Sequence, residues 1–382
     1  MTDTPAQTPR RKSRFGCRNC KLRKIKCDET KPRCNKCTEY KILCNFALGI
    51  PDLQLSAGGM ASHRGSAGIL SPPSSLPVIC SDASYSFRLD SDSLMKLEQF
   101  RSDITRPFSA NMTKIWKDEI PFVAFQHPYL MHAMLAVATA FRRTQHGVVR
   151  GCRTQTEIHH TLQCVYLFKR KLSQLIAAPD QDAIWATSAL LGLLAIVSFE
   201  ETSPEDAWPV RPVHASDLEW MRLTVGKSII WTLTDPLRTN GLFRAMASEY
   251  ADMEFSIPEI GIAGIPSFLI EACNLTETSN GDNNPYYVAA HLLVLLARLQ
   301  MLLGGSFPGI YMITFISQSQ LRFRRLLEDK DPVSLLLLAL WYREAGKALW
   351  WVRQRAEVDT RAIRIYLERF HYNQPGIIRL LP

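Results

Sequence analysis

Six cysteines in the first 44 residues have the type and spacing of a metal site. They are Cys17, Cys20, Cys27, Cys34, Cys37 and Cys44, so the pattern Cys-x₂-Cys-x₆-Cys occurs twice with an offset of 17 residues. Disulfides, redox CxxC pairs and metal binding can each place cysteines close together in a sequence. The remaining four cysteines, Cys80, Cys152, Cys164 and Cys273, are scattered and are expected to be free thiols.

Two of these three explanations fit the sequence poorly. Structural disulfides are typical of secreted proteins, but residues 1–14 are polar and basic and lack the apolar run of a secretory signal. A redox CxxC pair belongs at the head of a helix beside a sheet, and no alternating strand pattern is present. Metal binding therefore remains, and zinc suits thiolate pairs that are separated by two residues.

Six sulfurs can hold two tetrahedral zinc ions only if two of them bridge, because two ions need eight ligand positions. The internal repeat makes Cys17 and Cys34 equivalent, so we expect these two to be the bridges. One ion would take Cys17, Cys20, Cys27 and Cys34, and the other Cys34, Cys37, Cys44 and Cys17. Sulfur then fills every position and leaves none for water, which predicts two structural Zn²⁺ ions and no catalytic site.

The two halves of the repeat differ in charge. After Cys20 the chain places Lys21, Arg23, Lys24 and Lys26 around Leu22 and Ile25, two apolar residues that we expect to face the cluster. After Cys37 the corresponding segment holds one lysine and a glutamate. Lys and Arg can pair with guanine in the major groove of DNA, so the first half is predicted to meet double-stranded DNA.

The positive charge of the whole chain lies in this same segment. Residues 1–44 contain thirteen Lys or Arg against four Asp or Glu, whereas the rest of the chain holds equal numbers of both. A basic N-terminal segment followed by a neutral remainder, here called the body, indicates a nucleic acid or an anionic membrane surface as partner. The longest apolar stretch, residues 186–199, is too short for a membrane span.

The composition divides the chain into four parts. We expect a basic disordered tail over 1–13, a zinc binuclear cluster domain with two short helices over 14–46, a flexible linker over 47–92, and a large all-α domain over 93–382. The linker is rich in Ser, Pro and Gly and lacks the heptads of a dimerising coiled coil. The predicted fold class is therefore mostly α.

Helical periodicity dominates after residue 93 and predicts roughly ten helices. A wide apolar face follows Pro128, and 183–199 is apolar on nearly all sides, as in a central helix of a bundle. Asp331 is expected to cap a helix that begins at Pro332, and Gly346 to end it. The other predicted helices cover 161–176, 217–234, 287–304, 311–328 and 349–370.

The head of the chain resembles the fungal Zn₂Cys₆ binuclear cluster family of transcription factors. All six cysteines match, Pro32 matches the proline of the loop between the halves, and residues 20–27 match the basic recognition segment. The resemblance implies Arg23 and Lys24 as base readers at CGG-like sites, with Lys21 and Lys26 closer to phosphates. Arg14 and Arg18 complete the expected DNA-binding set. It further implies a nuclear regulator of RNA polymerase II transcription.

The body is similar to the regulatory domain of sterol-uptake-control-type regulators. The similarity rests on three segments, His127–His132, Glu219–Gly226 and Asp331–Trp351. It implies an all-helical domain that can hold an apolar ligand such as a sterol. Four tryptophans could line a pocket for such a ligand but are expected in the core instead, namely Trp220, Trp341, Trp350 and Trp351. Four histidines could suggest a second metal site but are expected in packing or surface positions, namely His127, His132, His159 and His160.

These features favour a transcription factor and leave other readings open. No HExxH, GxSxG, Walker A or GxGxxG pattern supports an enzyme. The body could act as a receptor for an apolar molecule, or the zinc cluster could bind protein or membrane in an interaction scaffold. Binding as a monomer and binding as a homodimer through the helical domain both remain open, because the linker has no coiled coil.

Overall fold

The computed structural model describes residues 15–31, 33–40, 42, 44–46, 78–145, 152–214, 216–319 and 321–382, and only the backbone of 224 and 225. The chain divides into two compact units, residues 1–75 and residues 76–382. The expected tail, the linker up to residue 77, Arg14 and Pro32 lie outside the described residues. The first unit contains the short helices α1 (Arg18–Leu22) and α2 (Asn35–Glu39).

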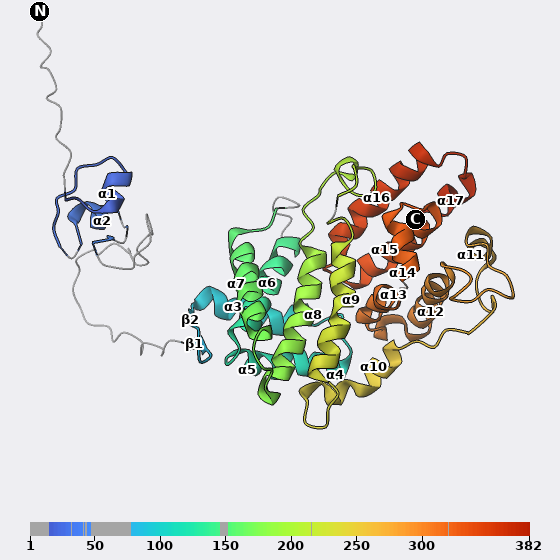
Figure 1. Ribbon diagram of the computed structural model, residues 1–382, viewed down its shortest axis with the longest axis horizontal. Helices are drawn as coiled ribbons and strands as arrows, with labels where there is room; N and C mark the ends of the chain where they lie inside the picture. Colours follow the sequence, from blue (N-terminus) through green and yellow to red (C-terminus); the bar gives the residue numbers. More distant parts are fainter. Residues whose placement is uncertain are drawn as a thin grey trace, which may run out of the picture. The chain divides into compact units, whose positions relative to one another are not determined.

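The second unit is mostly helical, with one small hairpin (Figure 1). Its strands are β1 (Val78–Ser81) and β2 (Ser86–Leu89). Its α-helices are α3 (Ser91–Gln99), α4 (Ala110–Lys114), α5 (Ile120–Ala124), α6 (Pro128–Gln145), α7 (Gln155–Leu172), α8 (Gln181–Val197), α9 (Glu219–Thr234), α10 (Ala247–Met253), α11 (Ser267–Ala272), α12 (Tyr287–Leu303), α13 (Ile313–Gln318), α14 (Leu321–Glu328), α15 (Pro332–Ala348), α16 (Arg353–Phe370) and α17 (Pro375–Leu380). The described part of the body therefore holds more and shorter helices than the ten expected.

The body is organised around long helices that pack in pairs. Helices α6, α7, α8 and α9 lie side by side, and α15 packs against α16 (Figure 1). Helix α6 begins at Pro128, as expected, and its residues from Pro128 to Phe141 are all buried. Helix α8 is buried on most sides, which confirms the central position predicted from its apolar composition. The tryptophans Trp220, Trp341, Trp350 and Trp351 are all buried in the core, as expected.

The hairpin corrects the expectation that the flexible linker extends to residue 92. Strands β1 and β2 pair in antiparallel fashion, and Cys80 and Leu89 are buried in the large core. The amide of Ser81 donates to the carbonyl of Phe125 at 3.0 Å, and Phe87 stacks on His132. Strands of four residues are too short to show a period in sequence, so packing against the helices is what orders this segment.

Asp331 caps α15 as predicted, since its carboxylate accepts from the Ser334 amide at 2.8 Å. Gly346, however, does not end the helix, which continues to Ala348. A Cβ added at Gly346 would lie 2.9 Å from the Cβ of Ala356 on α16. The glycine therefore permits close packing of α15 on α16 and does not act as a terminator.

Two other predicted helices have different bounds. The expected helix over 311–328 is divided into α13 and α14, because Ser319 adopts an extended backbone with ψ 126°. The helix expected from residue 349 begins instead at Arg353, because Leu349 is extended with ψ 109°. Trp350 and Trp351 lie in the turn between α15 and α16, where both are buried.

Two segments have the length and composition of a membrane-spanning helix, Ala178–Val197 and Tyr287–Ser306. The first is 67% buried inside the body and the second 28%. Helices in the core of a soluble protein can have the same length and apolar composition, so these two properties alone are weak evidence for a membrane span.

Candidate metal centre and nucleic-acid interface

All six cysteines of the N-terminal unit are buried and converge on one point. Their sulfurs form two groups of four, within each of which all sulfurs lie within 4.8 Å of one another. One group contains Cys17, Cys20, Cys27 and Cys34, and the other Cys17, Cys34, Cys37 and Cys44. The two groups share Cys17 and Cys34, which are the residues that the repeat predicts as bridges.

The separations of the sulfurs suit tetrahedral zinc. Two thiolates at about 2.3 Å from one tetrahedral ion lie about 3.8 Å apart. Cys34 Sγ lies 3.7 Å from Cys17 Sγ and 3.6 Å from Cys20 Sγ, and Cys17 Sγ lies 3.6 Å from Cys37 Sγ. A disulfide would bring two sulfurs to about 2.05 Å. The donor set therefore fits two structural zinc ions, and it does not fit disulfides.

The shared sulfurs also begin the two helices. Cys17 Sγ accepts from the Cys20 amide at 3.4 Å at the start of α1, and Cys34 Sγ accepts from the Cys37 amide at 3.3 Å at the start of α2. These amides face a sulfur that is negatively charged when it binds zinc, which stabilises both the thiolate and the helix end. The metal centre and the two helices are thus parts of one arrangement.

Two polar residues that the sequence analysis did not select join the halves. Asp28 follows the third cysteine of the first half and accepts from the amides of Asn35 and Lys36 at the start of α2. Asn45 stands 17 residues later in the second half and accepts from the Asn19 amide in α1 at 3.0 Å. Each half therefore caps the helix of the other, and the recurrence of Asp or Asn after the last cysteine of each half is the signal in the sequence.

Hydrogen bonding keeps Asp28 ionised. The Thr30 hydroxyl donates to its carboxylate at 2.6 Å, and together with the backbone donors of α2 it lowers the pKa of Asp28 to about 2. A negative charge at a helix start is favourable, because the helix dipole places positive charge there.

The cysteine thiols have perturbed pKa values for two opposing reasons. Burial raises the pKa of Cys37 to about 11, and it raises those of Cys20 and Cys34 still further. Burial acts the same way at Cys27 and Cys44, but backbone N–H donors outweigh it there and lower the pKa. Zinc binds the thiolate form, so binding releases protons and zinc affinity falls as the pH falls.

The basic segment of the first half lies on the surface of this unit. Arg18, Lys21, Lys24 and Lys26 are exposed, as a DNA-contacting face requires. Lys24 has a positive φ of 55° directly after α1, so the chain leaves the helix at this residue. The expected DNA contact Arg14 lies outside the described residues.

Arg23 differs from its neighbours because it contacts the second half of the module. Its guanidinium carbon lies 3.8 Å from the centroid of the Tyr40 ring, a cation–π distance, and the side chain is half-buried. Among the described residues, its Nη1 atom is buried without a hydrogen-bond partner. Tyr40 thus fixes the direction of one of the two expected base readers.

Leu22 does not face the cluster, contrary to expectation. Its side chain is 50% exposed, whereas Ile25 packs against the cysteines. At about 100° per residue, a side chain two positions after Cys20 points away from the side that Cys20 faces. Beyond α1 the chain turns back, which brings Ile25 to the cluster.

Residues 15–48 match the family model described as Fungal Zn(2)-Cys(6) binuclear cluster domain. These residues of the N-terminal unit therefore form a zinc binuclear cluster domain. Its six cysteines and their two overlapping groups of four supply the ligand set for two structural zinc ions.

Three relatives align with longer parts of the chain. Sterol uptake control protein 2 of Saccharomyces cerevisiae is 49% identical over 237 residues, which are 60% of this chain and 24% of that protein. The Zn(2)-C6 fungal-type transcription factor afumD of Aspergillus fumigatus is 27% identical over 272 residues, or 65% of this chain and 66% of that protein. Sterol uptake control protein 2 of Candida albicans is 50% identical over 134 residues, covering 33% of this chain and 17% of that protein. The chain therefore spans about a quarter of the yeast relative.

The histidines of the body form no metal site with the cysteines, aspartates or glutamates that the structure describes. His132 and His160 are buried, and their Nδ1 atoms share a hydrogen bond of 2.8 Å. Burial lowers the pKa of His132 to about 3 and that of His160 to about 4. Both are therefore neutral packing residues at neutral pH, as expected.

Proposed function

We propose that this protein is a zinc-dependent transcription regulator that binds double-stranded DNA through the basic segment of its zinc cluster domain. The observation that carries the proposal is the exposure of Lys21, Lys24 and Lys26 directly beside the six-cysteine centre. The zinc cluster family and a relative named as a transcription factor support it. A nuclear location and an action on RNA polymerase II transcription belong to the same proposal.

The six basic residues have distinct roles in this proposal. Lys24 and Arg23 read base edges at a CGG-like site, since Lys and Arg pair with O6 and N7 of guanine. Tyr40 holds the guanidinium of Arg23 and reduces the entropy that is lost when it engages a base. Lys21, Lys26, Arg18 and Arg14 contact phosphates, which give affinity and salt dependence without reading sequence.

The experiment compares Lys24→Ala with the matched control Lys36→Ala. Lys36 is an exposed lysine of the same domain, but it lies on α2 and pairs with Glu39 at 2.7 Å. Binding to duplexes with and without a CGG triplet is measured by fluorescence anisotropy at several salt concentrations, with zinc content determined for each variant. We expect Lys24→Ala to lose about 1–3 kcal/mol of binding to the CGG duplex and most of its preference for it.

Other variants separate base reading from phosphate contact. Lys21→Ala should weaken binding to both duplexes alike and reduce the slope of log K against log salt by about 1. Lys36→Ala should bind as the unaltered protein does. If Lys24→Ala retained its preference for CGG, or if Lys36→Ala lost as much, the assigned interface would be wrong.

The interaction-scaffold alternative makes a different prediction in cells. Chromatin occupancy of a double variant, Arg23→Ala with Lys24→Ala, is compared with that of the unaltered protein. Lost occupancy with zinc retained supports DNA binding, whereas unchanged occupancy supports a scaffold that is recruited by other proteins.

A second proposed function is that the helical body binds an apolar effector such as a sterol. Two relatives are named for sterol uptake control, and this name is what favours the proposal. Native mass spectrometry of the full chain from a fungal host should detect a retained lipid. A protein that carries none and does not respond to titrated sterols or fatty acids would count against this role.

Homodimerisation through the helical domain is also proposed, with α12 as the contacting element. This helix leaves Met301 85% and Leu302 80% exposed. Sedimentation velocity should find a dimer that Met301→Glu dissociates, and a monomer at micromolar concentration would contradict it.

A further inference from the structure

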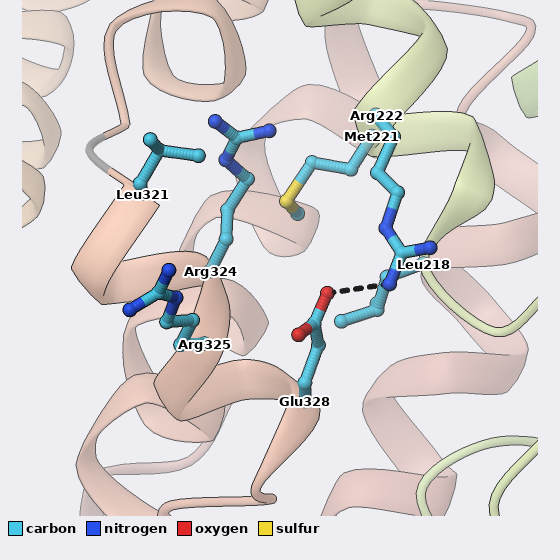
Figure 2. A pocket seen from close by; sticks show the side chains of 7 residues that line it. All are labelled: Leu218, Met221, Arg222, Leu321, Arg324, Arg325 and Glu328. Atoms are coloured by element: carbon cyan, nitrogen blue, oxygen red, sulfur yellow. Dashed lines mark hydrogen bonds and ion pairs between the residues drawn. The ribbon is translucent and has the colours of Figure 1, made fainter. Parts of the chain in front are cut away.

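The helical body contains a small pocket between the start of α9 and helix α14. Its volume is about 190 Å³. Figure 2 shows its seven lining residues, which are Leu218, Met221, Arg222, Leu321, Arg324, Arg325 and Glu328. The pocket thus combines apolar walls with three guanidinium groups and only one carboxylate.

The charges in the pocket do not balance. Arg222 Nη2 donates to Glu328 Oε1 at 2.7 Å, and this ion pair uses the only acidic side chain of the lining (Figure 2). Among the described residues, Arg324 and Arg325 have no side-chain hydrogen bond or ion pair. The lining therefore carries a net charge of +2 at neutral pH, because guanidinium groups stay protonated in proteins.

Arg324 is the most unusual of these residues. Its Nε atom is buried and, within the described part of the chain, has no hydrogen-bond partner. A buried donor without a partner is costly, and it calls for an acceptor such as an ion. Burial lowers the pKa of Arg324, and the single nearby carboxylate of Glu328 does not offset this. An anion in the pocket would satisfy the donor and stabilise the charge.

The neighbouring arginine on the same helix is a useful contrast. Arg322 donates to the backbone carbonyl of Asp282 and does not line the pocket. The basic residues of α14 therefore do not all lack partners. The unmet hydrogen-bonding capacity lies at the pocket itself.

We propose that this pocket binds a small organic carboxylate whose apolar part rests on Met221 and Leu218. Guanidinium groups bind carboxylates through paired hydrogen bonds, and Arg324 with Arg325 would supply the donors. Met221 and Leu218 line the pocket on the α9 side, across from Arg324 and Arg325 on α14, and supply its apolar wall there (Figure 2). The proposal does not depend on the function proposed for the zinc cluster domain.

The lining also discriminates against other ligands. Inorganic phosphate has no apolar part to rest on Met221 and Leu218, so it lacks the contact that the tail of an organic carboxylate makes there. A sterol has no charge to pair with the guanidinium groups, and a volume of about 190 Å³ lies below that of pockets that enclose drug-sized ligands. The effector class that fits is a short aliphatic or aromatic monocarboxylate.

The test uses the full zinc-loaded chain and sodium hexanoate as the probe. Isothermal titration calorimetry and thermal unfolding compare hexanoate with hexan-1-ol, which has the same tail without charge, and with inorganic phosphate. We expect saturable binding of hexanoate that weakens with added salt, and much weaker binding of hexan-1-ol and phosphate. Equal binding of hexanoate and hexan-1-ol would overturn the proposal, and so would tighter binding of phosphate.

Variants then locate the site. Arg324→Gln should weaken hexanoate binding about tenfold or more, whereas the matched Arg322→Gln on the same helix should leave it unchanged. Glu328→Gln should tighten hexanoate binding several-fold, because it removes the only negative charge of the lining. This gain does not depend on a loss of structure. Unchanged binding in Arg324→Gln, or weaker binding in Glu328→Gln, would refute the assignment.

Discussion

Replacing Cys34 by Ser should remove both zinc ions from the N-terminal domain. Cys34 Sγ belongs to both groups of four sulfurs and lies 3.6–3.7 Å from Cys20 and Cys17, close to the separation expected at tetrahedral zinc. A change at Cys34 therefore removes two of the eight ligand positions, one from each ion. A change at Cys27 removes a single position from the first ion only.

The size of the effect follows from this difference. Structural zinc contributes about 10–16 kcal/mol to the folding of small zinc modules at neutral pH. This domain has little else to stabilise it, since Ile25 and Phe46 are the hydrophobic residues that pack against the cysteines among its described residues. We expect two zinc ions per chain in the unaltered protein, fewer than one in Cys34→Ser, and about one in Cys27→Ser.

Zinc content is measured by inductively coupled plasma mass spectrometry after dialysis at fixed free zinc, and the intact mass is measured under native conditions. Cys152→Ser is the matched control, because Cys152 is an exposed thiol outside the zinc cluster domain. It should keep two ions. A Cys34→Ser protein that still holds two zinc ions would refute the bridging assignment, as would equal zinc loss in Cys34→Ser and Cys27→Ser.

Two further predictions concern the helical body. In the unfolded chain a histidine becomes protonated below about pH 6.5, whereas burial lowers the pKa of folded His132 to about 3 and that of folded His160 to about 4. The free energy of unfolding should therefore be constant above pH 6.5 and fall by about 2 kcal/mol per histidine by pH 5. Urea unfolding at both pH values should show this loss halved in His160→Gln and unchanged in the control His214→Gln, and a pH-independent stability would contradict it. The Arg143–Glu157 ion pair is buried at 2.9 Å, so Glu157→Gln should cost about 3–5 kcal/mol of unfolding free energy, and a cost below 1 kcal/mol would show that the pair is not desolvated.

The zinc ligands could be predicted from the sequence, because the spacing of the cysteines determines which thiolates can bind the same ion. The repeat offset of 17 residues also identified Cys17 and Cys34, which the structure places in both sulfur groups. The contacts of Asp28 and Asn45 across the halves were missed, because cysteine spacing does not include them and their one signal is the recurrence of Asp or Asn after the last cysteine of each half. The contact of Arg23 with Tyr40 depends on how the two halves are placed in space, which spacing alone does not determine.

In the body, the long helices were predictable, but most of their ends were not. Helices α6 and α15 have a strong apolar pattern with Pro128 or Asp331 at the start, and α8 is apolar on nearly all sides, so local signals and packing agree. Gly346 was misread because a glycine can serve close helix packing as well as termination. The β1–β2 hairpin was missed because its strands gain their order from tertiary packing, for example from Phe87 on His132.

DNA recognition by the zinc cluster domain is tested most directly by a gel-shift titration of the full chain on duplexes with and without a CGG triplet. The titration is run before zinc chelation, after it, and again after zinc is restored. We expect preferential binding to the CGG duplex, its loss on chelation and its recovery with zinc, because the metal holds the basic segment in place. Equal binding to both duplexes that does not change on chelation would contradict zinc-dependent recognition of CGG.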